Sequence, residues 1–278
     1  MKRHNLGKSL VYAYLAIVLI FLLLPICWMF ITSIKTNMEA YKFPPTFVPE
    51  APTFASYISL VAANSDFLTY YKNNYVVSFI TALVTTGLAV FAGYALSRFK
   101  YKWNNLIISA LIAAQIFPVI SRLISLYTML KSVSLLNTHF GLICALIAAS
   151  LPFSVILMVS FFDSIPKSIE QAAFIDGASR LQILFKVVMP LTKPGLLAVG
   201  IYTFLLTWDD YLHAVTLITS DNLRTLSTGI ALRYLGELSY DWSLINTISV
   251  VGTLPMMLFF FFFQKYMVQG LTAGAVKG

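Results

Sequence analysis

Two groups of polar residues interrupt stretches of the sequence that are otherwise apolar, and their side chains could bind a polar solute. The first group is Gln115 with Arg122, and the second is Trp208, Asp209, Asp210 and His213. Polar groups are costly inside a membrane, so they tend to mark either a solute pathway or an ion pair. Gln115 and His213 are therefore candidates for such a pathway.

The remaining members of the second group have chemistry that would suit a sugar. The indole of Trp208 can stack on the C–H face of a pyranose, while the carboxylates of Asp209 and Asp210 accept hydrogen bonds from hydroxyls. We expect these three residues to contact the solute. Two alternatives stay open, because the carboxylates could instead pair with Arg122 or lie near a water-filled edge of the membrane.

The histidines and cysteines of the sequence form no pattern of a metal or haem site. His4, His139 and His213 lie in the N-terminal tail, at the end of an apolar stretch and in the middle of another, so no facing pair for a haem is expected. Cys27 and Cys144 lie far apart in separate apolar stretches, which predicts neither a disulfide nor a metal site. A membrane-bound electron-transfer subunit is accordingly disfavoured.

The sequence also lacks a phosphate-binding loop, which requires G-x-x-x-x-G-K-[ST] after a strand. Gly7-Lys8-Ser9 resembles the end of this motif, but Lys2 stands where its first glycine should be. We therefore expect no catalytic residue, no bound metal, no cofactor and no ATP hydrolysis in this chain.

Composition indicates that lipid surrounds much of the surface. The chain has 278 residues, of which 59% are hydrophobic and 11% charged, whereas soluble domains carry about 25% charged residues. A membrane helix needs roughly 20 mostly apolar residues. Six stretches qualify: Leu10–Ile31, Tyr75–Leu96, Leu106–Leu130, Phe140–Phe162, Pro194–Ile218 and Leu244–Phe263. Pro118 lies near the centre of the third stretch and predicts a kink there.

The basic residues predict how these helices are oriented. The formal charge of +8 lies mainly in short loops between apolar stretches, which is a membrane-orientation signal rather than a sign of nucleic-acid binding. With the N-terminus inside, the inner segments hold twice as many Lys and Arg residues as the outer ones, so both termini are expected in the cytoplasm. The expected segments are a cytoplasmic tail (1–9), a first span (10–31), an outer loop (32–74), a five-helix core (75–266) with an inner loop (163–193), and a cytoplasmic tail (267–278).

The inner loop is longer than a simple connection between two spans requires, and its first half has the signals of a short helix. Ser168 can cap a helix start, with Gln171 three residues later as in a capping box. Glu170 would lie in the first turn, where the helix dipole favours an anion. Gly177 suits a left-handed helix end. These signals predict a helix over Ser168–Asp176.

A second helical stretch, Ser179–Met189, is expected to stop before Pro190. In the first helix, the small side chains of Ala172 and Ala173 leave a smooth face. Such a face could lie in a groove of a partner protein or rest on lipid headgroups, and the residues alone do not decide between these alternatives.

The order of these motifs resembles that of a known family. Glu170-Gln171-Ala172-Ala173, Asp176-Gly177-Ala178 and Val187-x-Met189-Pro190 resemble the EAA loop of ATP-binding-cassette (ABC) importer permeases. Further matches to the maltose-type, sugar-importing branch are Pro44-Pro45-Thr46, Asn74, Leu135-Leu136-Asn137-Thr138, Leu151-Pro152-Phe153, Trp208-Asp209-Asp210-Tyr211 and the tail from Gly270 to Gly278. The resemblance covers essentially the whole chain.

One position departs from the family pattern. The family usually has Glu where this chain has Gln171, and an acidic residue of the loop pairs with a basic residue of the ATPase. Gln can donate and accept hydrogen bonds but cannot form a salt bridge. Glu170 is adjacent and is expected to replace it, although one residue turns about 100° around a helix. Which of the two side chains faces the ATPase stays open.

The resemblance implies a type I ABC importer permease fold, an all-α membrane protein with six transmembrane helices and a cytoplasmic coupling helix. It implies a bacterial plasma-membrane location and, as partners, a homologous second permease, two ATPase subunits that use ATP and Mg, and an extracellular sugar-binding protein. The expected cargo is a carbohydrate, and an oligosaccharide in particular. The residues expected to contact the ATPase are Glu170, Gln171, Ala172, Ala173, Asp176, Gly177 and Pro190.

Two outer segments, Thr32–Asn74 and Ser220–Asp241, are expected to meet the binding protein because of their length. A secondary solute carrier is the main alternative function. Such carriers often contain internal repeats and discontinuous helices. The sequence shows no convincing internal repeat, and a carrier does not need a patterned inner loop.

Overall fold

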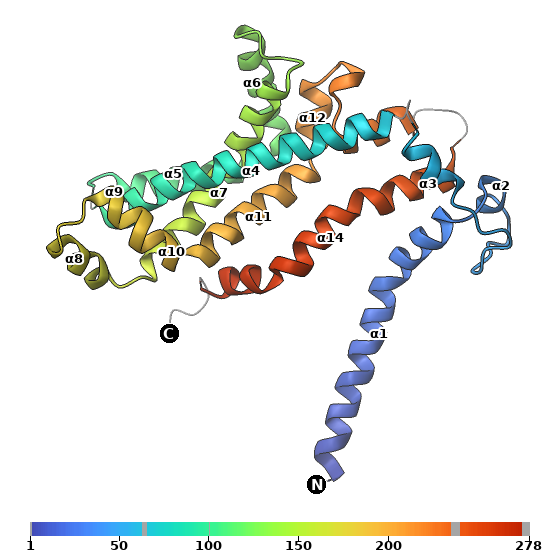
Figure 1. Ribbon diagram of the computed structural model, residues 1–278, viewed down its shortest axis with the longest axis horizontal. Helices are drawn as coiled ribbons and strands as arrows, with labels where there is room; N and C mark the ends of the chain where they lie inside the picture. Colours follow the sequence, from blue (N-terminus) through green and yellow to red (C-terminus); the bar gives the residue numbers. More distant parts are fainter. Residues whose placement is uncertain (1, 63–65, 100, 235–239, 274–278) are drawn as a thin grey trace. The chain divides into compact units, whose positions relative to one another are not determined.

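The computed structural model describes residues 2–62, 66–99, 101–234 and 240–273, which form helices joined by loops (Figure 1). The α-helices are α1 (Lys2–Ser33), α2 (Asn37–Ala40), α3 (Ala55–Leu60), α4 (Asp66–Arg98), α5 (Asn104–Ile116), α6 (Val119–Ser132), α7 (His139–Asp163), α8 (Lys167–Ile175), α9 (Arg180–Gln182), α10 (Met189–Leu191), α11 (Lys193–Trp208), α12 (Leu212–Leu217), α13 (Leu226–Gly229) and α14 (Trp242–Ala273). Two π-helical segments (Ile183–Val188 and Ile230–Tyr234) and one 3-10 turn (Asp221–Leu223) complete the described elements.

Some expectations fall outside the described residues. These are the last five residues of the C-terminal signature, 274–278, residues 63–65 of the first long outer segment, and residues 235–239 of the second. Residues 1–68 with 230–254 form one compact unit, and residues 69–229 with 255–278 form another.

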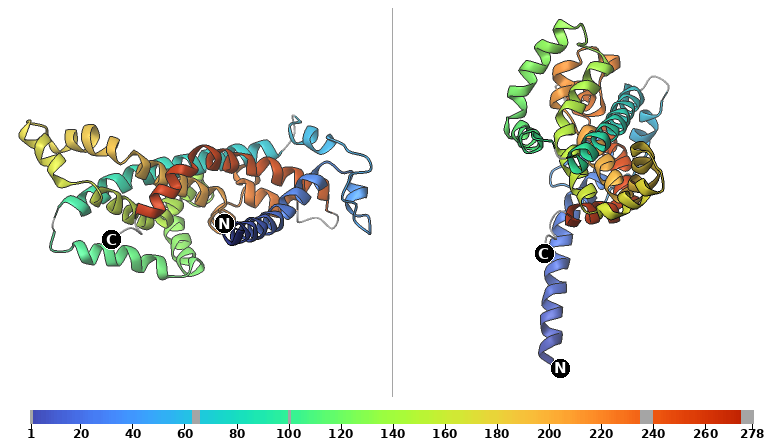
Figure 2. Two further views of the ribbon diagram at one scale, coloured as in Figure 1. Left: turned by 90° about the horizontal axis from the view of Figure 1, so that it is seen from below. Right: turned by 90° about the vertical axis from the view of Figure 1, so that its left-hand side faces the viewer.

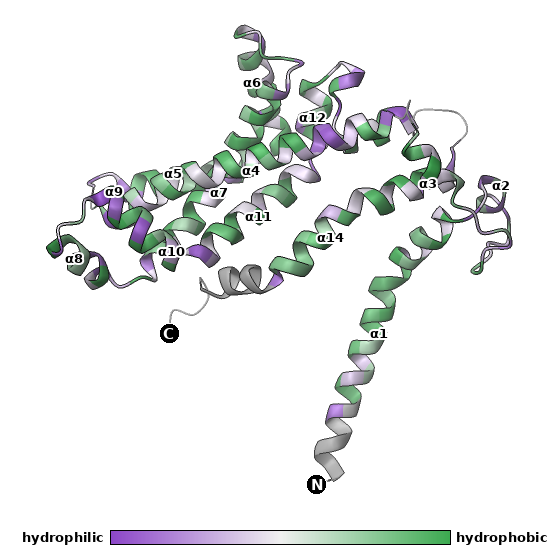
Figure 3. Cartoon of the chain, viewed as in Figure 1, coloured by the Kyte–Doolittle hydropathy of each residue, from purple (hydrophilic) through white to green (hydrophobic). Residues whose placement is uncertain are grey.

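Four of the predicted spans correspond to single helices that are long and apolar enough to cross a membrane. These stretches are Leu10–Ser33, Asp66–Arg98, His139–Asp163 and Trp242–Gln264. Hydrophobic residues cover most of their length (Figure 3). Two bent helix pairs also qualify, which gives up to six spans if each pair is counted as one. This arrangement agrees with the predicted all-α membrane fold.

The third span was predicted as one kinked helix, and the structure differs from this prediction. Instead of bending, the chain breaks at Phe117–Pro118, and α5 and α6 meet at 102°. Figures 1 and 2 show α6 turning away from the line of α5. The cause is local, because Phe117 before the proline takes an extended conformation with ψ 133° and cannot continue the helix.

The fifth span was predicted as one helix over Pro194–Ile218, and this prediction is wrong. Helix α11 ends at Trp208, and the chain restarts as α12 at Leu212. The carboxylate of Asp210 accepts a hydrogen bond from the backbone amide of Ala214 at 3.1 Å. A short acidic side chain that bonds nearby amides favours a helix start over a helix interior.

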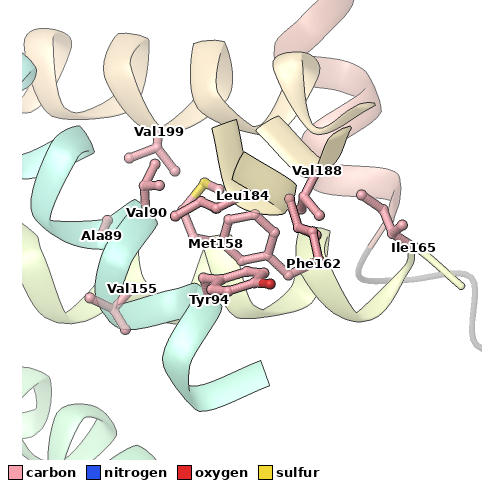
Figure 4. Packing of buried hydrophobic residues seen from close by; sticks show 11 residues of the cluster. Ala89, Val90, Tyr94, Val155, Met158, Phe162, Ile165, Leu184, Val188 and Val199 are labelled. Carbon is pink, nitrogen blue, oxygen red and sulfur yellow. The ribbon is translucent and has the colours of Figure 1, made fainter. Parts of the chain in front are cut away.

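The core of the second unit joins three long helices to the second half of the inner loop. Ala89, Val90 and Tyr94 of α4 pack with Val155, Met158 and Phe162 of α7, with Val199 of α11, and with Ile165, Ile183, Leu184 and Val188 (Figure 4). Gly93 permits the close approach of α4 and α7, since a Cβ there would lie 2.8 Å from the Cβ of Met158. The loop is therefore anchored to the helices of this unit.

In the first unit, residues 35–50 of the predicted outer loop fold around two buried charges. The ammonium of Lys35 donates to the carbonyl of Thr46 and lies 4.8 Å from the ring centre of Trp28. The carboxylate of Glu39 accepts hydrogen bonds from the Thr46 hydroxyl at 2.7 Å and from the Glu50 amide at 2.9 Å. These hydrogen bonds lower the pKa of Glu39 below its ordinary value.

Candidate functional site

Helix α8 forms the first half of the inner loop, close to its predicted limits but with a different start. It begins at Lys167, with Pro166 before it and no side-chain cap, so the prediction that Ser168 caps the helix is wrong. A proline there supplies a fixed φ of −57° and needs no amide partner. The predicted helix end is confirmed, since Gly177 has φ +83°.

The capping box lies instead at the start of α9. The amide of Ser179 donates to Gln182 Oε1 at 2.8 Å, and the amide of Gln182 donates to Ser179 Oγ at 3.4 Å. Pro190 does not end the second helical stretch as predicted, because a π-helical segment leads into α10, which contains it. Pro190 lies in the first turn of α10, where a missing amide costs little.

Glu170 points into its own subunit. Its carboxylate accepts a hydrogen bond from the hydroxyl of Tyr94 at 2.9 Å and pairs with the Nε of Arg98, both in the last part of α4. Only 11% of the Glu170 side chain is exposed, and only 5% of the Arg98 side chain. The expectation that Glu170 replaces the family glutamate at the ATPase is therefore not favoured, because its charge is already paired.

The guanidinium of Arg98 connects three elements. Besides its bond to Glu170 in α8, it donates from Nη2 to the carbonyl of Phe162 at the end of α7 at 2.7 Å, and to that of Ile165 just after α7 at 3.2 Å. Nη1 donates to the hydroxyl of Ser97 in α4 at 2.8 Å. We call Tyr94, Arg98 and Glu170 the clasp. It fastens α8 to the ends of α4 and α7.

Several other residues of α8 are exposed. Gln171 and Ala172 are exposed, as are the large apolar side chains of Phe174 (62%) and Ile175 (84%). Gln171, Phe174 and Ile175 border a hollow of about 560 Å³, whose lining also includes Lys167 and the three residues of the clasp. An exposed aromatic side chain next to a hollow is typical of a surface that a partner covers.

The other predicted contact residues divide between exposed positions after α8 and the core. Asp176, Gly177 and Pro190 are exposed, whereas Ala173 is half-buried and packs against the hydrophobic core. Sequence reasoning missed the clasp, because Arg98 was counted only as an orientation signal. The position of Arg98 in the last turn of a predicted span could have indicated the clasp, since an arginine there can reach helix carbonyls.

The structure separates the predicted solute-binding residues. Trp208 is 4% exposed and packs among the rings of Tyr71, Tyr75 and Phe204, at centroid distances of 5.7, 6.4 and 5.4 Å. The Trp208 ring is therefore part of an aromatic cluster and not an open stacking platform.

The two acidic residues after Trp208 also differ. Asp209 is exposed. Asp210 Oδ1 lies 2.7 Å from Nδ1 of His213, and the side chain of His213 is 8% exposed. Arg122 is not the partner of either, since no carboxylate of the described residues lies within 4.0 Å of it. Gln115 is exposed on α5.

Comparisons with known proteins agree on one kind of protein. Residues 85–273 match the family model described as "Binding-protein-dependent transport system inner membrane component". The sulfoquinovosyl glycerol transport system permease protein SmoH of Agrobacterium fabrum is 39% identical over 98% of this chain and 95% of its own length. The trehalose/maltose transport system permease protein MalG of Thermococcus litoralis is 30% identical over 100% of both.

A solved structure shares the fold. It is a chain of a bacterial ABC transporter involved in import of the acidic polysaccharide alginate, with a TM-score of 0.80, 24% identity, and coverage of 96% of this chain and 98% of that one.

Proposed function

This chain belongs to the family of binding-protein-dependent transport system inner membrane components, and from this premise we propose that it is the permease through which an ABC importer takes up a carbohydrate. It is a multi-pass membrane transport subunit and not an enzyme. The cargo is proposed from its relatives, since permeases named for sulfoquinovosyl glycerol and for trehalose/maltose are similar to it over almost their whole length. A secondary carrier is not favoured by this membership.

The observation that carries the coupling proposal is the hollow where α8 meets the clasp. Gln171 and Phe174 are exposed at this hollow, while the charge of Glu170 in the same lining is already held by the clasp. We assign this hollow and the exposed residues beside it to an ATPase subunit, with Ala172, Asp176, Gly177 and Pro190 at its margin. Two such subunits would bind and hydrolyse ATP with Mg, and their closure would move α8.

The clasp would make that movement reach the spans. Because Arg98 bonds the end of α4, the end of α7 and α8 together, a displacement of α8 would be passed to both helices. Coupling requires that the docked surface differ between the two states of the transporter. A homologous second permease would form the other half of the pathway, and a sugar-binding protein would deliver cargo to the outer loops. Both termini are proposed to lie in the cytoplasm.

A strain lacking this gene tests the function. Cells receive a ¹³C-labelled polysaccharide hydrolysate, and intracellular labelled sugars are measured by mass spectrometry. Uptake should be lost in the deletion strain, restored by the wild-type permease, and absent when the cognate ATPase carries a substitution of its phosphate-loop lysine. Uptake that persists with the inactive ATPase and follows an ion gradient would instead establish a secondary carrier.

Changing Phe174 to Glu should detach the ATPase. An aromatic side chain at the centre of an interface commonly contributes 2 kcal/mol or more, so we expect a loss of about thirtyfold in affinity. The measurement is the amount of ATPase that co-purifies with the tagged permease. Leu181→Glu is the matched control, because Leu181 is equally exposed (61%) but does not border the hollow. Equal ATPase recovery in both variants would contradict the assignment.

Changing Gly177 to Val should uncouple ATP hydrolysis from uptake. The left-handed conformation costs a residue with a Cβ roughly 1–2 kcal/mol. The fraction of molecules whose loop has the native conformation should therefore fall about tenfold. A Cβ at Gly177 meets no atom within 4 Å in this chain, so crowding inside the subunit is not the cause. Gly177→Asn is the control, since Asn tolerates positive φ. Normal uptake per ATP in the Val variant would refute this role.

A further inference from the structure

A hollow of about 390 Å³ lies in the second unit, where the break between α5 and α6 meets α7 and α12. Helix α12 contacts both α6 and α7 in this region (Figure 1). Its lining includes Phe117, Ser121, Arg122, Ser125, Pro152 and His213. The volume falls within the range of roughly 300–1,000 Å³ that is usual for small-molecule sites.

The charge of Arg122 in this hollow has no counter-ion. Its Nε is buried and has no hydrogen-bond partner among the described residues, and none of their carboxylates lies within 4.0 Å. The residue as a whole is half-buried, and a cation that buries a donor without a partner is costly unless something else supplies the anion. One alternative from the sequence, pairing with Asp209 or Asp210, is not formed.

Asp210 is bonded to His213, and His213 is a second polar side chain that lines the hollow. The ionised carboxylate of Asp210 can only accept, so the proton of this contact lies on Nδ1 of His213; in the neutral imidazole Nε2 is then an acceptor. The same carboxylate also accepts from the Ala214 amide. Asp210 itself does not line the hollow. Arg122 is thus the one side chain with a fixed charge among the lining residues.

We propose that this hollow, the Arg122 site, binds an acidic group of the imported carbohydrate, either a carboxylate or a sulfonate. This proposal rests on the proposed function of sugar import and narrows its substrate class. A guanidinium presents several N–H donors in one plane, which match the two or three oxygens of such a group. The hydroxyls of Ser121 and Ser125 can donate to the remaining oxygens of this group, and Nε2 of His213 can accept from a ring hydroxyl of the sugar.

The position of the site also suits passage of a solute. The proline break interrupts the third span at this level, so α6 leaves the direction of α5 and opens space beside α7. Irregular backbone at membrane depth is tolerated where it lines a cavity. An unpaired cation at such a break would attract an anionic solute, and its single charge would allow the solute to leave again.

The first experiment determines whether the natural cargo carries an acidic group. The cognate binding protein is purified from cells grown on a mixed carbohydrate hydrolysate, and the sugars it releases are separated by anion exchange and identified by mass spectrometry. We expect a sugar with at least one acidic group. An uncharged sugar would overturn the Arg122 site while leaving carbohydrate import intact, whereas release of no carbohydrate would overturn the proposed function itself.

The second experiment uses the complete importer in proteoliposomes, with the released sugar and its carboxyl-reduced (or desulfonated) form as probes. Arg122→Gln should lower uptake of the acidic form at least about tenfold and reduce the preference for it over the neutral form towards one. Arg122→Lys should retain part of the preference, because it keeps the charge but not the planar donors. Lys131→Gln, at the exposed end of the same helix, is the control and should behave as wild type.

The same proteoliposomes also test two other groups that could supply an anion to Arg122. If Arg122 pairs with an acidic residue of the second permease, Arg122→Gln will lower the recovery of that subunit. If it holds a lipid phosphate, the defect will follow the content of phosphatidylglycerol in the proteoliposomes. Either result, or an unchanged preference for the acidic form in Arg122→Gln, would overturn the proposal.

Discussion

Replacing Arg98 by methionine should abolish ATP-driven uptake, and replacing both Arg98 and Glu170 by methionine should recover part of it. The single change leaves the Glu170 carboxylate almost buried without its cation, which typically costs about 3–5 kcal/mol. Two apolar side chains of similar volume remove the unpaired charge, and such double replacements are often nearly neutral. The inner loop would therefore dock again.

The measurement is a double-mutant cycle on two observables. Limited proteolysis reports how firmly α8 is held, and uptake of the ¹³C-labelled hydrolysate reports coupling. We expect the Arg98→Met and Glu170→Met effects on proteolysis to be strongly non-additive, since the two side chains are in direct contact.

This cycle also decides what Glu170 does. If its carboxylate paired with the ATPase, Glu170→Met would lose the ATPase whether or not Arg98 were present, and the double variant would be no better than Glu170→Met alone. Recovery in the double variant requires that the two residues act on each other. Tyr94→Phe, which removes only the 2.9 Å hydrogen bond to Glu170, should give a smaller loosening of about 1 kcal/mol.

Much of the fold follows from the length and periodicity of apolar stretches, and the exceptions have local causes. Each of four predicted spans lies within a single helix of the structure, because an apolar segment in lipid must satisfy its own backbone. The two spans that differ contain Pro118 and Asp210. Pro118 indicated a kink, but the extent of the break depends on how neighbouring helices cover the freed backbone, which the sequence does not state.

The position of the coupling helix could be predicted from the sequence, but the direction of its side chains could not. Glycine at 177 indicated the end of α8, because few other residues adopt φ +83°. The direction of the Glu170 side chain could not be predicted, because it depends on an ion pair with Arg98. The two residues are far apart in the sequence, and only the fold brings them into contact. The capping signal was present twice, at Ser168 and Ser179, and only Ser179 uses it, since Pro166 already starts the first helix.

Replacing Trp208 by alanine should destabilise the permease while leaving its apparent affinity for cargo unchanged. The ring is 4% exposed and contacts Phe204, Tyr75 and Tyr71, so the change opens a large cavity in an aromatic cluster. Changes from Trp to Ala in cores cost about 3–5 kcal/mol. The amount of folded permease and its melting temperature should both fall, and uptake should decline in proportion.

The measurement separates stability from binding. Uptake is recorded over a range of concentrations of the sugar released by the binding protein and is normalised to the folded permease in the membrane. A structural ring lowers the maximal rate per cell, whereas a stacking ring raises the half-saturation concentration. Trp208→Phe should keep most of the stability, because it retains an aromatic contact with Phe204 and Tyr75.

Asp209→Asn is the matched control, since Asp209 is the exposed neighbour of Trp208. It should change the melting temperature little, as is usual for surface substitutions. If Trp208→Ala kept the wild-type melting temperature and instead raised the half-saturation concentration, the ring would have to turn out of its cluster to meet the sugar. The stacking role expected from the sequence would then be restored, and the buried position would describe one state of a moving side chain.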